Sequence, residues 1–182
     1  MPAMQTLTEQ RLAVQIWTSD YVKLPLIIRH HVASISDVPV GMSMLIEPID
    51  ALARQKGRDA LFLDFPQEGY EDPSDLLGVD WDSVPIRQQV ITWLNQNQIE
   101  WCICGGFADE NVMSFGYCGL IYIDVPFDTN NPTYQKLFDY LETPEGEAKL
   151  PGVKLCYLPL EKAMKNAHHD APGFWEHWVE NF

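Results

Sequence analysis

Basic residues are scarce in this sequence. It has 12 Lys and Arg against 26 Asp and Glu, which leaves a formal net charge of −14 at pH 7. Such a charge repels the phosphate backbone of nucleic acids, and no basic stripe with interleaved aromatic residues occurs. We therefore expect no direct binding of DNA or RNA.

Long apolar runs are also missing from the N-terminal part. The longest apolar run there is Leu24–Ile28, which includes a proline, whereas a membrane-spanning helix needs about 20 apolar residues. The first basic residue, Arg11, falls inside a helix-like pattern and does not precede an apolar stretch. The sequence thus predicts no signal peptide, no membrane contact and a cytoplasmic location.

Several motifs that carry chemistry are absent. The patterns G-x-x-x-x-G-K-[ST], G-x-G-x-x-G, G-x-S-x-G and H-E-x-x-H do not occur, nor does the ligand spacing of an EF-hand. The sequence consequently favours no enzyme class. It leads us to expect no cofactor, and it assigns no catalytic residue or metal ligand.

Four cysteines fall in apolar, strand-like segments, and we interpret them as reduced and buried: Cys102, Cys104, Cys118 and Cys156. The first two alternate along one predicted strand, so their thiols share a face, and Cys118 could lie across a hairpin from them. A small Cys/His-dependent enzyme or a metal-binding protein is therefore an alternative. The C-terminal histidines could add ligands to such a site: His168, His169 and His177, together with Asp170.

The hydrophobic content of 46% over 182 residues is typical of a folded protein. We expect a single domain over 1–182, in which a helical part, 1–57, packs on an α+β core, 58–182. Helical spacing of apolar residues predicts helices over 7–18, 24–35, 48–57, 83–98, 131–143, 160–167 and 172–182. Short runs rich in aromatic and β-branched residues predict strands over 60–65, 101–104, 120–125 and 153–158.

The predicted order of elements from 60 to 158 is β, α, β, β, α, β. This is the order of a ferredoxin-like split βαβ sandwich, in which two helices cover one face of a four-stranded sheet. The sequence therefore predicts an α+β fold of this type, with an antiparallel or mixed sheet and additional helices before and after it.

The negative charge is concentrated in the middle of the chain. Residues 59–135 contain thirteen acidic residues and one base, Arg87, which accounts for −12 of the −14. The densest part is 64–82, with seven acids, no base and several interleaved apolar residues. We interpret this segment as a contact surface for a partner, made of Asp64, Glu68, Tyr70, Glu71, Asp72, Asp75, Asp80, Trp81 and Asp82.

An acidic surface with aromatic anchors suits a basic protein partner, because charge speeds the encounter and buried aromatics supply affinity. The first hypothesis is a non-enzymatic protein that neutralises or inhibits such a partner, which could be a toxin or a nucleic-acid-binding protein. An immunity protein, an inhibitor or a DNA mimic would act in this way. A further alternative is a ferredoxin-like module that self-associates, for example as a homodimer, with acidity serving only solubility.

Overall fold

The computed structural model of the chain describes most of its second half and little of its first quarter. The described residues are 15–16, 46–67, 76, 78–111 and 117–181. The helix predicted over 24–35 lies outside them, and so does most of the one predicted over 7–18.

The strands form one open sheet, ordered β1-β5-β2-β4-β3. The neighbours β5-β2, β2-β4 and β4-β3 are antiparallel, and β1 runs parallel to β5. The four longer strands confirm the predicted strands, although β3 and β4 are shorter than expected. The strands are β1 (Gln15–Ile16), β2 (Ala60–Asp64), β3 (Trp101–Ile103), β4 (Ile121–Ile123) and β5 (Lys154–Leu158).

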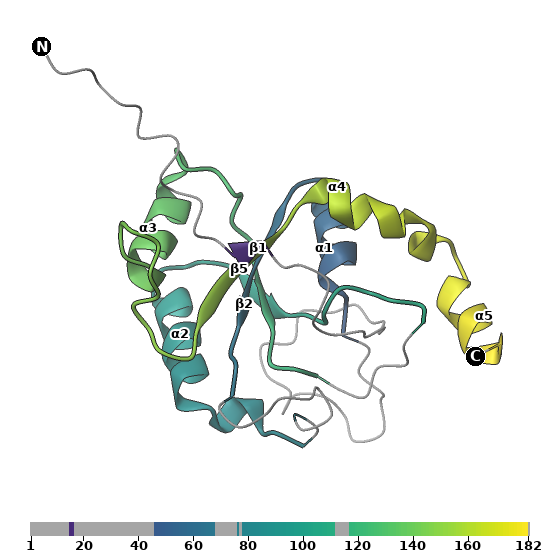
Figure 1. Cartoon of the computed structure of the whole chain (residues 1–182), viewed down its shortest axis with the longest axis horizontal. Coiled ribbons are helices and arrows are strands. Elements are labelled where there is room, and N and C mark those ends of the chain that lie inside the picture. The colour runs from purple at the N-terminus through teal and green to yellow at the C-terminus, as the bar shows by residue number, and fades with distance from the viewer. Residues whose placement is uncertain (1–14, 17–45, 68–75, 77, 112–116, 182) are drawn as a thin grey trace, which may run out of the picture.

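Helices flank this sheet, so the chain is a mixed α+β protein with a four-stranded antiparallel sheet (Figure 1). The segment predicted as one helix over 160–167 divides into a short α-helix and a 3-10 helix. The α-helices are α1 (Ile49–Lys56), α2 (Pro85–Gln96), α3 (Pro132–Leu141), α4 (Leu160–Ala163) and α5 (Phe174–Asn181). The 3-10 helices are η3 (Trp81–Ser83) and η4 (Met164–Asp170).

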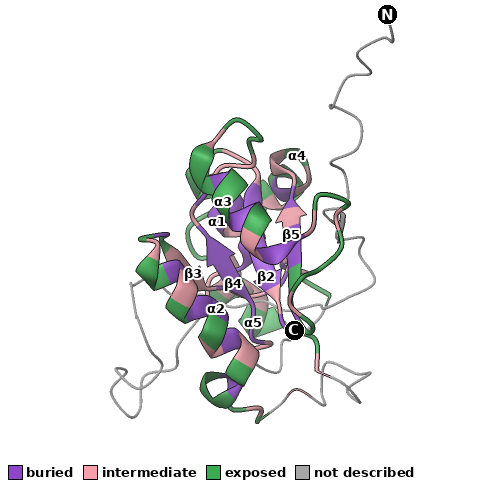
Figure 2. Ribbon diagram, turned by 90° about the vertical axis from the view of Figure 1, so that its left-hand side faces the viewer, coloured by how far each residue is buried: buried purple, intermediate pink, exposed green. Residues whose placement is uncertain are grey.

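The two faces of the sheet bury different sets of side chains, because successive residues of a strand point to opposite faces. In β2, Leu61 and Leu63 face α2 and α3, whereas Ala60 and Phe62 face α1 and α4. All four are at most 1% exposed. Burying each large apolar side chain contributes about 1.5–3 kcal/mol. In Figure 2 the strands are buried and lie between helices whose outer faces are exposed.

Two helix ends follow the sequence signals, and one does not. Asn131 is of a residue type that predicts a helix cap, and it caps α3 by accepting the N–H groups of Thr133 and Tyr134; Gly57 ends α1 in the left-handed conformation, at φ 62°. Asp82 and Ser83, which are also common capping types, predict a cap for α2, and this prediction is wrong. Val84 precedes α2 without a side-chain cap, because Asp82 and Ser83 belong to a separate turn, η3.

Gln15 and Ile16 form a strand, whereas the sequence pattern predicts a helix there. Their backbone pairs in parallel with Cys156 and Tyr157 of β5. An unpaired strand edge offers a row of hydrogen-bonding groups, and tertiary pairing of this kind overrides a modest helical preference. This part of the helix prediction is therefore wrong.

Trp81 of η3 anchors the end of the acidic segment 64–82 in the core. Its side chain is 4% exposed, and its indole N–H donates to the carbonyl of Tyr117 at 2.9 Å. Gly119 faces the ring, and a Cβ on Gly119 would come within 2.3 Å of it. The φ of Gly119 is also +80°, which glycine adopts without steric cost.

Glu142 directly follows α3, and its carboxyl group is buried. Its side chain is 6% exposed, and its Oε2 has no hydrogen-bond partner among the described residues. Burial raises the pKa of Glu142 to about 7. The folded protein therefore holds this proton over a pH range in which the unfolded chain has lost it. That contribution to stability is complete below the ordinary glutamate pKa and is lost as the pH rises through 7.

We expect Glu142→Gln to remove this pH dependence. At pH 8 the variant should be about 1–2 kcal/mol more stable than the wild type, because glutamine carries no charge to desolvate. Urea unfolding at pH 5 and pH 8 measures the difference. Glu145→Gln is the matched control, since Glu145 is exposed nearby. An equal change of stability with pH in wild type and Glu142→Gln would contradict the prediction.

Candidate functional site

Among the described residues, a compact group of side chains that could bind a metal ion lies where η4 approaches the loop after β3. The chain leaves β5, turns at Pro159 into α4 and continues as η4, which carries two adjacent histidines. His169 points inward and is 5% exposed, whereas the side chain of His168 is half exposed. The loop after β3 brings Glu110 to both of them.

A buried carboxylate fixes the three segments around this cluster. Asp50 of α1 is fully buried, and its Oδ1 accepts the backbone N–H of Ala108 at 2.9 Å. Its Oδ2 accepts from Asn166 of η4 at 3.0 Å, and Asn166 also donates to the carbonyl of Ala108 at 2.8 Å. The loop that carries Glu110 is thereby held against α1 and η4.

Arg54 adds a second set of contacts between α1 and η4. Its guanidinium donates to Asp50 at 2.8 Å and to both carboxylate oxygens of Asp170, at 2.7 and 2.8 Å. A fourth bond, of 2.9 Å, reaches the carbonyl of Ala163. Bidentate pairing of an arginine with a carboxylate fixes the relative orientation of the two groups more than a single hydrogen bond does. It fixes the end of η4, next to His168 and His169.

The three side chains present three potential metal ligands at close range. Glu110 Oε1 lies 3.0 Å from His168 Nε2 and 3.8 Å from His169 Nε2. One ligand atom from each residue lies within 4.8 Å of the other two. Ligands around a single zinc ion, each about 2.0–2.2 Å from it, are about 3–3.5 Å apart. Small rotations of the exposed Glu110 and His168 side chains would therefore bring all three into range.

The protonation states of the cluster also suit a metal. Burial, together with the neighbouring His168, lowers the pKa of His169, so its imidazole is neutral at pH 7. Neither ring nitrogen of His169 has a hydrogen-bond partner among the described residues. The hydrogen bond with His168 lowers the pKa of Glu110, which keeps its carboxylate ionised. Neutral imidazole and ionised carboxylate are the forms that bind metals.

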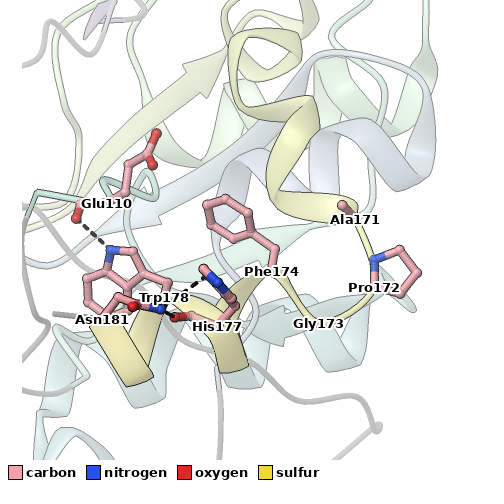
Figure 3. Close-up of a pocket in the computed structure, with 8 residues that line it drawn as sticks. All are labelled: Glu110, Ala171, Pro172, Gly173, Phe174, His177, Trp178 and Asn181. Atoms are coloured by element: carbon pink, nitrogen blue, oxygen red, sulfur yellow. Dashed lines mark hydrogen bonds between the residues drawn. The ribbon is translucent and has the colours of Figure 1, made fainter.

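Helix α5 covers one side of the cluster. Its aromatic residues contact both histidines in edge-on or tilted arrangements, and the indole N–H of Trp178 donates to the carbonyl of Glu110 at 2.7 Å. A cavity of about 580 Å³ lies beside it, lined among others by Phe174, His177 and Trp178 (Figure 3). The carboxylate of Glu110 points away from the indole of Trp178 in this view.

Chemically, two imidazoles and one carboxylate are a donor set for Zn²⁺ and for other divalent transition metals. Three protein ligands leave at least one coordination position open for water or a further ligand. Of the C-terminal group singled out from the sequence, only His168 and His169 join the cluster. Asp170 is paired with Arg54, and His177 lines the cavity.

Glu110 is the ligand that sequence reasoning missed. It lies 58 residues before His168 and forms no motif with it. Only the fold of the loop after β3, fixed through Ala108 and Asp50, brings the two together.

Part of the acidic surface predicted from the sequence lies outside the described residues: Glu68, Tyr70, Glu71, Asp72 and Asp75. Asp64 ends β2 and is half-buried, and burial raises its pKa. Asp80 is exposed, and its carboxylate caps η3 by accepting the N–H of Asp82. Trp81 lies in the core, where its indole anchors the C-terminal end of the acidic segment 64–82.

Asp82 belongs to a network around Arg87, the one base of residues 59–135. The side chain of Arg87 is 1% exposed and donates to Asp82 at 3.1 Å and to the Tyr117 hydroxyl at 3.0 Å. It also reaches the carbonyls of Trp81 and Gly119, at 3.2 and 3.3 Å. Arg87 therefore ties η3 and α2 to the segment before β4, and its charge is directed inward.

The cysteines do not join the histidine cluster. All four lie among the described residues and none is in a disulfide, and burial raises their thiol pKa values, to about 11 for Cys102 and Cys118 and about 12 for Cys156. The pKa of the fully buried Cys104 is raised well above its ordinary value. At neutral pH the thiols are protonated, whereas the thiolate is the form that binds metal or attacks a substrate. Among the described residues, the histidine cluster is therefore the stronger candidate site.

Comparison with known proteins gives no relative from which a function could be transferred. No protein-family model matches the chain, and no curated protein or solved structure is significantly similar to it. Among the described residues, no helix has both the length and the apolar character needed to cross a membrane.

Proposed function

We propose that this protein binds a divalent transition metal, with Zn²⁺ as the first candidate, through Glu110, His168 and His169. The observation that carries the proposal is His169, which is buried beside a carboxylate and a second imidazole, while neither of its ring nitrogens has a hydrogen bond to any residue that the structure describes. A buried polar group left without a partner costs about 1–3 kcal/mol. A metal ion bound at Nε2 would offset that cost.

The surroundings of the cluster support this function over a purely structural role. The bonds from Asp50, Asn166 and Arg54 fix the backbone that carries the ligands, so little ordering would remain to be done when metal binds. One carboxylate and two neutral imidazoles around a divalent ion leave a net charge of +1. Such a site would attract water, hydroxide or an anionic ligand to its open position.

The test is calorimetric titration of untagged, chelator-treated protein with Zn²⁺, because a histidine tag would itself bind the metal. We expect one ion per chain and an increase in melting temperature with zinc concentration, as ligand binding to the folded state requires. The absence of both binding and thermal stabilisation would contradict the proposal. The effect of removing His169 is argued in the Discussion.

We also propose that the fold is of the ferredoxin-like type predicted from the order of its elements. The strand order β5-β2-β4-β3 with antiparallel neighbours supports it, as does the placement of α2 and α3 against the same face of the sheet. The cluster of Glu110, His168 and His169 then lies on the other side of the sheet, where α1, α4 and η4 are found (Figure 1).

A second candidate function is binding of a basic protein partner by the acidic segment 64–82. One observation favours it: Arg87, the sole base of 59–135, is buried and already paired, so its charge is directed away from the surface. The exposed acids of that stretch include Asp80 and Glu100. This surface would attract a basic toxin or nucleic-acid-binding protein by long-range electrostatics.

For this second candidate we expect salt-sensitive binding to a basic probe, an immobilised ten-residue lysine peptide. Replacing Glu68, Glu71, Asp72 and Asp75 with amides should weaken binding at least about tenfold at low salt, because four charges are lost. The matched control neutralises four exposed acids elsewhere: Glu145, Glu147, Glu161 and Glu176. Equal weakening by both sets would show that only net charge matters and would count against a specific surface.

A further inference from the structure

Helix α5 is attached to the rest of the protein in an unusual way. None of its described residues is buried, and Val179 is 64% exposed. The helix follows a turn in which Gly173 has φ +80°, and a Cβ added to Gly173 would meet no atom within 4 Å among the described residues. Burial in the core therefore does little to hold α5 in place.

The contacts of α5 fall instead on the candidate metal ligands. The ring of Phe174 lies 5.5 Å from that of His168 and 4.7 Å from that of His169, and Trp175 lies 4.7 Å from His169. Trp178 donates to the carbonyl of Glu110 at 2.7 Å. Each of the three ligands is thus contacted by an aromatic residue of this one helix.

We propose that α5 is the outer shell of the metal site, in which Phe174, Trp175 and Trp178 position the ligands so that metal binding and docking of the helix are coupled. This inference rests on the metal-binding function proposed above. Outer-shell groups that orient ligands commonly change metal affinity by about 10- to 100-fold. The aromatic residues do so here by restricting the rings of His168 and His169 and the backbone of Glu110.

The coupling acts in both directions. If the docked helix raises the affinity for metal, bound metal must stabilise the docked helix by the same factor, since the two equilibria are linked. Metal fixes the two imidazoles and the carboxylate against one another and gives α5 a rigid surface to pack on. Without metal, α5 rests on a half-exposed His168 and on the backbone of Glu110, whose exposed carboxylate is hydrogen-bonded to His168. Bound metal therefore increases the fraction of time in which the aromatic face of α5 is packed against the cluster.

The experiment uses the full-length protein and Co²⁺, whose visible absorption reports ligand geometry. The test variant combines Trp175→Ala with Trp178→Phe, which removes one of the two rings on His169 and the N–H donated to Glu110 without removing a ligand. The control is Val179→Ala, which changes an exposed residue of the same helix. We expect the test variant to bind Co²⁺ at least about fivefold more weakly and with an altered spectrum, and the control to match the wild type.

A second measurement needs no substitution. Hydrogen exchange of residues 174–181 in the wild type should slow at least about fivefold when Zn²⁺ is added. Unchanged exchange in the presence of bound zinc, or equal Co²⁺ affinity and spectrum in both variants, would overturn the coupling and leave metal binding intact. Failure of the wild type to bind either ion would overturn both proposals.

Discussion

Replacing His169 with alanine is expected to lower the affinity of the protein for Zn²⁺ by at least about 100-fold. His169 is the buried ligand of the proposed site, and its imidazole packs against the aromatic rings of Phe174 and Trp175 of α5. Its loss leaves an exposed histidine and an exposed glutamate, which alone bind zinc weakly because zinc sites in proteins use three or four ligands. Calorimetric titration of wild type and variant at pH 7.5 measures the ratio.

Two further variants sharpen this result. Glu110→Gln keeps the shape of the side chain but removes its charge, and it should also weaken zinc binding strongly. His177→Ala is the matched control, because His177 lines the neighbouring cavity but does not belong to the cluster. Its affinity should stay within about twofold of wild type. Zinc binding by His169→Ala at wild-type affinity would contradict the assignment of the site.

The same titration should depend on pH in a defined direction. Protons compete with the metal for imidazole, so zinc affinity should fall as the pH falls. Burial lowers the pKa of His169, so this residue stays neutral below the ordinary histidine pKa of about 6.5. The decrease in zinc affinity that comes from protonation of His169 should therefore appear only below the ordinary histidine pKa.

Replacing Arg87 with methionine is expected to destabilise the fold by about 3–5 kcal/mol. The guanidinium satisfies the carbonyls of Trp81 and Gly119 and the hydroxyl of Tyr117 in a buried setting. Methionine fills a similar volume but donates no hydrogen bond, so those groups lose their partner. A loss of this size is a large fraction of the total stability of a typical domain.

Urea unfolding followed by circular dichroism measures the effect. Lys165→Met is the control, because Lys165 is exposed and the same charge is removed. Arg87→Lys should lie between the two, since lysine keeps the charge but cannot reproduce the arginine fork. A destabilisation of less than about 1 kcal/mol in Arg87→Met would show that solvent replaces the network.

Local sequence signals predicted much of the fold because they act over a few residues. Asn131 and Pro132 fix the start of α3 through one side-chain cap and one restricted φ angle, and neither depends on the rest of the chain. The alternation in β2 likewise follows from strand geometry. Gln15–Ile16 was predicted wrongly because its strand exists only by pairing with β5, which follows some 140 residues later.

The candidate site was predictable only in part. The two adjacent histidines are visible in the sequence, but Glu110 becomes their neighbour only through the bonds of Ala108 to Asp50 and Asn166. Trp81 was expected at the surface because its segment is acidic, yet the space left by Gly119 admits its ring to the core. Neither outcome follows from composition or spacing, since both depend on contacts between distant segments.

The bonds of Asp50 have a consequence for how the molecule assembles. Its partner Asn166 lies 116 residues further along the chain, and Ala108 lies 58 residues away. Contacts this distant in sequence close large loops, which costs chain entropy and slows folding. During synthesis the histidine cluster cannot close until His169 has left the ribosome. A product that ends before Asn166 would keep the pairing of Asp50 with Arg54 inside α1 but would lack the bond that holds η4 to Asp50.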